Sequence, residues 1–252
     1  MPLITFLTDY GTADSYVGEV KGVIASLAPG VPVVDLTHHV PPGDVRAGHY
    51  LLSQIWPRFP EGTIHLAVVD PGVGTQRLAL ALEAAGHYFV GPDNGLLTSA
   101  AAHEGASGVV LPVPPGASVT FHGRDLFAPA AAALGRGEHL VKLGHRLEST
   151  PVMLEFRAPH YEGKTVIGEV IYVDRFGNLV TSLTPAEVPG YATVEIEETD
   201  LGPLRTTFGD VPSGNPIAYI GSTGRVEIAV RGGSAARRFG ISTGGEVRAR
   251  LG

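Results

Sequence analysis

The hydrophobic positions of the first half of the chain alternate between two spacings. The apolar run from Leu3 to Leu7 predicts a strand, and the apolar residues of 17–27 then recur at the spacing of one helix face until Pro29-Gly30. The same order follows with a strand over 31–36, a helix over 45–56 and an apolar strand over 63–69. Strands that alternate with helices predict an α/β domain with a mostly parallel sheet flanked by helices.

Two further elements are predicted in this half. The apolar segments 78–83 and 87–90 flank Ala84-Ala85-Gly86 and predict a hairpin. Pro129 suits the first turn of an alanine-rich helix that ends at Gly135. This helix places His122 on the loop that leads into it.

The pattern changes near Pro151. Short β-branched runs follow, separated by turn residues, over 165–173, 179–182, 192–196, 217–220, 226–230 and 246–251. They predict a small antiparallel barrel or sandwich. We therefore expect an N-terminal α/β domain over 1–155 and a smaller C-terminal all-β domain over 156–252.

Composition narrows the function. With 252 residues, 44% of them hydrophobic, the chain can bury a full core, and the absence of cysteine excludes disulfides and thiolate chemistry. A formal net charge of −7 argues against nucleic acid as a partner. The first apolar stretch is too short for a signal peptide or a membrane span, so we expect a cytoplasmic protein with no membrane partner.

Three segments place polar groups after apolar runs: 69–77, 121–125 and 172–178. In parallel sheets, ligands bind at the carboxyl ends of the strands, and Asp9 and Asp70 both fall at such ends. Asp70, Arg77 and His122 supply an anion, a permanent cation and a group that titrates near neutrality. Together they could activate a water molecule.

Simpler interpretations of these segments exist. Asp70-Pro71-Gly72 alone is a common turn, and the following glycines resemble a dinucleotide loop only weakly because Arg77 stands where the third glycine belongs. His38, His39 and His49 could suggest a metal, but adjacent histidines on a strand point apart, which favours hydrogen-bonded or surface histidines and no metal site. No G-x-S-x-G elbow is present, which argues against a serine hydrolase.

Six motifs in order make a stronger case than any one of them. They are Thr8-Asp9-Tyr10-Gly11, Asp35-Leu36-Thr37-His38, Val69 to Arg77, Gly91-Pro92-Asp93-Asn94-Gly95, Phe121-His122-Gly123-Arg124-Asp125 and Asp174-Arg175-Phe176-Gly177-Asn178. Over nearly its whole length the chain closely resembles the S-adenosyl-L-methionine hydrolases, or hydroxide adenosyltransferases. This family was once classed as a domain of unknown function and is related to the fluorinating and chlorinating adenosyl enzymes.

The resemblance implies that water cleaves S-adenosyl-L-methionine to adenosine and L-methionine, with no metal and no cofactor. Asp70, Arg77 and His122 match the family's water-handling triad, at which the halogenating relatives differ, so hydroxide is the implied nucleophile. Which of Asp70 and His122 accepts the proton stays open. Ser182 departs from the asparagine that relatives often carry there, but it lies outside the motif.

The resemblance also implies the binding residues. Asp9 matches the carboxylate that holds the ribose hydroxyls. Asn178, Glu227 and Val230 match positions around the adenosine. Asp174 and Ser222 match positions near the methionine end or the nucleoside, and Phe176 is a further implied substrate-binding residue. Relatives form trimers with the ligand between the N-terminal domain of one subunit and the C-terminal domain of the next, which implies a homotrimer here.

Two other functions are compatible with the sequence. One is a halide-dependent adenosyl transferase that forms a 5′-halo-adenosine, which retention of Arg77 and His122 disfavours. The other is a protein that binds adenosine or S-adenosyl-L-methionine without turnover. Product analysis with and without chloride, and the effect of losing Asp70, would separate them.

Overall fold

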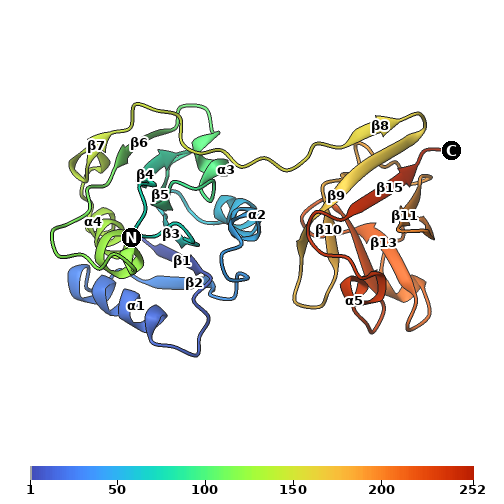
Figure 1. Ribbon diagram of the computed structural model, residues 1–252, viewed down its shortest axis with the longest axis horizontal. Helices are drawn as coiled ribbons and strands as arrows, with labels where there is room; N and C mark the ends of the chain where they lie inside the picture. The colour runs from blue at the N-terminus through green and yellow to red at the C-terminus, as the bar shows by residue number, and fades with distance from the viewer. Residues whose placement is uncertain (1) are drawn as a thin grey trace. The chain divides into compact units, whose positions relative to one another are not determined.

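The computed structural model describes residues 2–252. Its contacts divide the chain into two compact units, Met1–Leu154 and Glu155–Gly252, and each unit has its own hydrophobic core. Figure 1 shows helices and strands mixed in the first unit and mainly strands in the second. The predicted combination of an α/β unit with an antiparallel β unit is confirmed.

Within residues 2–154, one mixed sheet has the order β2-β1-β3-β5-β4-β6-β7. The strands are β1 (Ile4–Thr8), β2 (Val33–Thr37), β3 (Ile64–Val68), β4 (Ala79–Ala84), β5 (His87–Pro92), β6 (Ser107–Val110) and β7 (His145–Arg146). The pairs β1–β2, β1–β3 and β3–β5 are parallel, while β4, β6 and β7 join antiparallel. The parallel half therefore contains the strands that the sequence pattern predicted from residues 3–69.

The predicted hairpin is β4–β5, closed by Ala85 and Gly86. Both residues have positive φ, 49° and 76°, as a two-residue turn that matches the strand twist requires. The second strand of the hairpin, β5, lies beside β3 and continues the parallel order. On its other side β4 pairs with β6, where the antiparallel half of the sheet begins.

Four helices cover the sheet over the described part of this unit: α1 (Tyr16–Leu27), α2 (Val45–Ile55), α3 (Thr98–Ala101) and α4 (Ala128–Gly135). Helices α1 and α4 pack together on one face, and α2 and α3 lie on the other (Figure 1). Asp44 is the N-cap of α2, and its carboxylate accepts the Ala47 N–H at 2.9 Å and so satisfies a free donor of the first turn.

The segment before α4 differs from the prediction. His122 does not lie on a loop but is the N-cap of a π-helical turn, Gly123–Phe127, which runs directly into α4. Gly123 lets Tyr10 approach this turn closely, because a Cβ there would lie 2.2 Å from the Tyr10 hydroxyl oxygen. The wide turn thus packs directly against the segment that follows β1.

The parallel half contains a topological switch point. From β1 the chain passes to β2 on one side, and it then returns to β3 on the other side of β1. Asp9 directly follows β1, and Asp70 follows β3 by two residues. Their common edge is therefore the place where such sheets bind ligands.

Over residues 155–252, eight strands form one sheet with the order β12-β11-β15-β9-β10-β14-β13, with β8 also paired to β9. They are β8 (His160–Glu162), β9 (Thr165–Val173), β10 (Leu179–Thr181), β11 (Thr193–Ile196), β12 (Thr199–Pro203), β13 (Pro216–Ile220), β14 (Val226–Val230) and β15 (Glu246–Arg250); α5 spans Ala235–Phe239. A bridge between Arg205 and Tyr219 joins the segment after β12 to β13 and nearly closes the sheet. The predicted small antiparallel barrel is confirmed.

No helix in the described residues is long and apolar enough to cross a membrane.

A buried histidine pair lies on the α2 face of the first sheet. His65 is fully buried and contacts the Thr5 hydroxyl through Nδ1 at 2.8 Å and His87 Nδ1 through Nε2 at 3.2 Å. Burial, and then the neighbouring His87, lowers the pKa of His65 to about 3. His65 is therefore neutral in the folded protein, whereas an unfolded chain protonates it below about pH 6.5.

We expect acid to destabilise the first unit through this site. Between pH 6.5 and about 3 the unfolded state binds one more proton at His65 than the folded state does. The free energy of unfolding therefore decreases as the pH is lowered, by up to ~1.4 kcal/mol per pH unit for His65 alone. Fluorescence of Trp56, the single tryptophan of the chain, during urea titrations at several pH values measures this unit. His65→Gln should flatten the profile and His103→Gln, at an exposed histidine, should not; equal profiles would contradict the assignment.

Candidate active site

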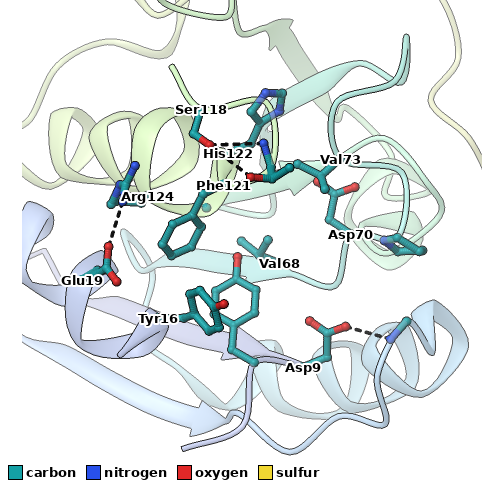
Figure 2. Close-up of a pocket in the computed structure, with 15 residues that line it drawn as sticks. Asp9, Tyr16, Glu19, Val68, Asp70, Val73, Ser118, Phe121, His122 and Arg124 are labelled. Atoms are coloured by element: carbon teal, nitrogen blue, oxygen red, sulfur yellow. Dashed lines mark hydrogen bonds and ion pairs between the residues drawn. The ribbon is translucent and has the colours of Figure 1, made fainter. Parts of the chain in front are cut away.

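A cavity of about 580 Å³ opens at the switch point of the first unit. Its walls come from the ends of β1 and β3, the start of α1, the segment before α2 and the π-helical turn (Figure 2). The lining residues are Asp9, Tyr10, Tyr16, Glu19, Gly43, Val68, Asp70, Pro71, Val73, Ser118, Thr120, Phe121, His122, Gly123 and Arg124. Three of the predicted site residues, Asp9, Asp70 and His122, therefore share one cavity.

Arg77 is not among the residues that line this cavity, but it joins Asp70 to His122. Its Nε donates to Asp70 Oδ1 at 2.9 Å, and its Nη2 donates to Asp70 Oδ2 at 2.5 Å. The same Nη2 donates to His122 Nδ1 at 2.9 Å. Only 6% of the Asp70 side chain and 9% of the Arg77 side chain is exposed. The three residues thus form one buried hydrogen-bonded cluster.

This geometry fixes the protonation of His122. A guanidinium only donates hydrogen bonds, so the Nδ1 that faces Arg77 must accept and carries no proton. Burial, and then the positive charge of Arg77, lowers the pKa of His122. At neutral pH the ring is therefore the uncharged tautomer with its proton on Nε2.

Asp9 lies at the other end of the cavity. Its Oδ2 accepts the Gly43 N–H at 2.8 Å, which fixes the carboxylate relative to the segment before α2 (Figure 2). Gly43 has a φ of +73°, a conformation that suits glycine. A carboxylate accepts about four hydrogen bonds, so Asp9 keeps acceptor capacity for two hydroxyl groups of a ligand.

Three aromatic rings form the wall between these groups. Tyr10, Tyr16 and Phe121 contact one another edge to face, with centroids 5.3–6.0 Å apart. Beside them Arg124 donates to Glu19 at 2.8 Å and lies 4.8 Å from the Phe121 ring centroid. This wall is apolar and suits a flat or weakly hydrated part of a ligand.

A second cavity, of about 720 Å³, lies in the second unit. It is lined by Asp174, Phe176, Asn178, Phe208, Tyr219, Ser222, Glu227, Val230, Arg231, Gly232, Gly233 and Arg237. The six remaining predicted site residues are all among them. Apart from Arg77, which lines neither cavity, the structure distributes the predicted residues over two cavities, one in each unit.

A tight turn organises one wall of the second cavity. Asp174 Oδ1 accepts the backbone N–H groups of Phe176 and Asn178, both at 2.8 Å, and its Oδ2 accepts Asn178 Nδ2 at 2.8 Å. Gly177 has a φ of +82°, and a Cβ there would lie 2.0 Å from the Ser234 hydroxyl oxygen. Phe176, on this turn, is 75% exposed and lines the cavity.

A carboxylate and a phenol face each other across β13 and β14. Tyr219 donates to Glu227 Oε2 at 2.6 Å, in register on the paired strands. Burial raises the pKa of Glu227, and nearby Asp174 adds to the effect. A Cβ on Gly221 would lie 1.9 Å from Glu227 Oε1, so this glycine leaves the space that the carboxylate occupies.

Two of the histidines that raised the question of a metal, His38 and His39, have separate hydrogen-bond partners. His38 is buried and bonds Thr8 Oγ1 through Nδ1 at 2.9 Å, while His39 is exposed beside Thr12. The interpretation as hydrogen-bonded or surface histidines is confirmed for both. Among residues 2–252, no group of three or more histidine, cysteine, aspartate or glutamate side chains could hold a metal ion.

Several cavity residues did not follow from the sequence. Tyr10 and Phe121 stand directly beside Asp9 and His122 within recognised motifs, and their position there was the available signal. Tyr16 is the first residue of α1, one position before the predicted helix, and no motif pointed to it. Tyr219 could have been found only from its register opposite Glu227 on β14.

The fold and both cavities define a class: a two-unit protein with an α/β unit that carries a buried acid–guanidinium–imidazole cluster and a β-barrel unit that carries a second cavity. Family models describe both units, the SAM hydroxide adenosyltransferase N-terminal domain over residues 4–144 and the C-terminal domain over residues 168–248. The chain belongs to the SAM hydroxide adenosyltransferase family.

Individual relatives agree with this membership. A protein from Thermus thermophilus named (R)-S-adenosyl-L-methionine hydrolase is 44% identical over 97% of this chain and 98% of its own length. A solved structure of an uncharacterized conserved protein from Thermotoga maritima matches with a TM-score of 0.89 at 36% identity, over 98% of this chain and 99% of that one. A fluorinase from Actinopolyspora mzabensis is 30% identical over 98% of this chain and 96% of its own length.

We expect Arg77 to control the pKa of His122. Arg77→Met removes the positive charge that lowers this pKa and leaves Asp70, which raises it, so the His122 pKa should rise. Nitrogen-15 NMR of the imidazole across a pH titration measures the change and should report the Nε2–H tautomer in the unmodified protein. Arg77→Lys keeps the charge and is the control. A His122 pKa that is the same in all three proteins would contradict this electrostatic account.

Proposed function

We propose that this protein hydrolyses (R)-S-adenosyl-L-methionine to adenosine and L-methionine. The observation that carries the proposal is the buried contact of Arg77 with both Asp70 and His122 at the first cavity. The names of the full-length relatives support the substrate and its epimer.

In the proposed reaction Asp70 is the proton acceptor. His122 is a poor candidate, because its Nδ1 already accepts from Arg77 and its Nε2 already carries the proton. Each oxygen of Asp70 accepts one bond from Arg77, which leaves each with a further acceptor site for a water molecule. The Nε2–H of His122 can donate to the oxygen of that water and hold it in place.

The water oxygen attacks the 5′ carbon in line with the C–S bond. The C5′–O bond forms, the C5′–S bond breaks with its electron pair leaving on sulfur, and the water proton passes to Asp70. Because the sulfonium charge disappears as the neutral thioether leaves, a cavity that excludes bulk water favours the transition state over the separated charges. Positioned acid-base assistance of this kind is typically worth ~10²–10⁴ in rate.

Asp9 and the second cavity supply recognition. Asp9 would accept hydrogen bonds from the two ribose hydroxyls and so point the 5′ carbon toward Asp70. In the second cavity, Asn178, Glu227 and Val230 would surround the adenine, with Phe176 covering it. Asp174 and Ser222 would contact the methionine end or the nucleoside.

Since these residues belong to two units, we further propose that a homotrimer completes each site. The first cavity of one subunit would be joined by the second cavity of its neighbour. S-adenosyl-L-methionine is the substrate in this scheme, and no cofactor takes part.

The reaction is tested with each sulfonium epimer in water labelled with oxygen-18. The expected result is adenosine that carries one labelled oxygen at the 5′ position, unlabelled L-methionine, and faster turnover of the R epimer. Chloride should change neither product. Formation of 5′-chloro-adenosine, or binding of the substrate without any product, would contradict the proposal.

The roles of the three clustered residues are tested by substitution. Asp70→Asn keeps the shape but removes the proton acceptor, so kcat should fall by about 10²–10⁴ while KM stays within a few-fold. His122→Ala and Arg77→Ala should also lower kcat far more than they weaken binding. Asp200→Asn, at an exposed aspartate of the second unit, is the matched control. Equal losses of affinity with unchanged kcat would contradict these roles.

Shared sites are tested by mixing two inactive variants. Asp70→Asn disables the first cavity and Asp174→Ala the second, yet a mixed trimer holds one intact site in three. If subunits mix at random, co-expression should restore roughly a quarter of the normal activity. No recovery in co-purified mixed oligomers would mean that each site belongs to a single subunit.

A further inference from the structure

The turn after β5 contacts both segments that carry the buried cluster. Asn94 Nδ2 donates to the backbone carbonyl of Val69, the residue before Asp70, at 2.8 Å. The N–H of Asp93 donates at 2.9 Å to the carbonyl of Leu78, which also accepts Arg77 Nη1 at 3.3 Å. Two neighbouring residues of one turn therefore hold the backbone on the two sides of the Asp70–Arg77 pair.

Asn94 contacts the chain just beyond the point where the pairing of β3 with β5 ends. The register of β3 with β5 ends at Leu66 and Val90, although Gly91 still approaches closely, since a Cβ there would lie 2.3 Å from the Ala67 carbonyl oxygen. Val69 lies beyond this ladder and is fully buried. A buried carbonyl without a partner is costly, and the Asn94 amide supplies the donor that a strand would otherwise provide.

The orientation of the Asn94 amide is fixed by its second bond. Leu96 N–H donates to Asn94 Oδ1 at 3.2 Å, so the oxygen must face Leu96 and the NH₂ group must face Val69. On the other side, α2 packs tightly on the same residues, because a Cβ on Gly48 would lie 2.9 Å from a Leu96 methyl and 3.0 Å from a Val69 methyl. Val69 is thus held by Asn94 on one side and by α2 on the other, and this fixes the backbone position of the next residue, Asp70.

We infer that Asn94 is a positioning residue for the hydrolysis: it sets the place of Asp70 relative to Arg77 and His122 through the Val69 carbonyl. It touches neither the first cavity nor the cluster itself. The expected effect of Asn94 on kcat rests on the proposed function. The expected effect on the structure, that loss of the Asn94 donor disturbs the Arg77–His122 contact, does not rest on it.

The experiment compares two variants of the same turn. Asn94→Asp keeps the acceptor for Leu96 but sets an oxygen against the Val69 carbonyl, whereas Thr98→Val removes a hydroxyl that bonds Gly95 O at 2.7 Å and Leu154 N at 2.8 Å, away from Val69. Because small displacements of a reacting group cost up to about 100-fold, kcat of Asn94→Asp should fall by about 10- to 100-fold with KM within about twofold. Thr98→Val should lower the melting temperature but leave kcat within about twofold.

Asn94→Ala is the second variant, should Asn94→Asp fail to fold. It leaves room for a water molecule at the Val69 carbonyl, so its loss of kcat should be smaller. Normal kcat in the folded Asn94 variants would overturn the inference, and so would a loss of kcat in Thr98→Val as large as theirs. Asn215→Asp, at an exposed asparagine, controls for the change of charge.

A spectroscopic readout separates this inference from the proposed function. In the unmodified protein the nitrogen-15 shifts of His122 should report Nδ1 as an acceptor, and in the Asn94 variants this signature should weaken. If the unmodified protein forms no adenosine, the proposed function fails while the His122 spectra still decide the role of Asn94. Unchanged His122 shifts in Asn94→Asp would overturn it.

Discussion

The first cavity depends on one buried cation. Arg77 is almost fully enclosed, and an enclosed charge is stable only when it is paired and its donors are used. The guanidinium meets this requirement with the Asp70 carboxylate, the His122 imidazole and the Leu78 carbonyl. Each partner is thereby constrained: both oxygens of Asp70 accept a hydrogen bond from Arg77, and His122 is held as one tautomer. The chemistry at the cavity surface is thus set by a residue that does not reach that surface.

In the proposed reaction, the first unit supplies the chemistry, whereas Asp9 of the first unit and the second unit share recognition of the substrate. The first unit presents the buried cluster and an aromatic wall at the ends of parallel strands, where loops can converge on a ligand. The second unit presents a turn and a cross-strand pair on an antiparallel sheet. In both, the functional carboxylates accept backbone or side-chain donors of the chain itself, as Asp9 does from Gly43 and Asp174 from its own turn. Their orientation therefore does not depend on a bound ligand.

Sequence patterns predicted the elements that are long or strongly periodic, and the strand ends that place Asp9 and Asp70 at one edge. They missed β6, β7, β8, β12, α3 and α5, because these short elements carry glycine, proline, small or charged residues where the predicted strands carry an apolar run. Motif resemblance grouped Asp70, Arg77 and His122, but it could not reveal that Arg77 is buried away from the cavity lining, because that depends on its packing against His122 and Phe127 of the π-helical turn. The role of Asn94 was equally hidden, since it follows from the close approach of Gly91 to β3.

Charge explains why such an arrangement suits a sulfonium substrate and releases its products. In the first cavity, Asp70 is paired with Arg77, Glu19 is paired with Arg124 and His122 is uncharged, so Asp9 gives the end where we propose that the ligand binds a negative charge. A sulfonium cation is attracted to that charge, whereas adenosine is neutral and methionine no longer carries charge on sulfur. The electrostatic attraction therefore acts on the substrate and is lost once the C–S bond breaks, which limits binding of the products without weakening capture of the substrate. A free cationic residue in place of the paired Arg77 would cancel this difference, which is a physical reason to keep the guanidinium buried against its carboxylate.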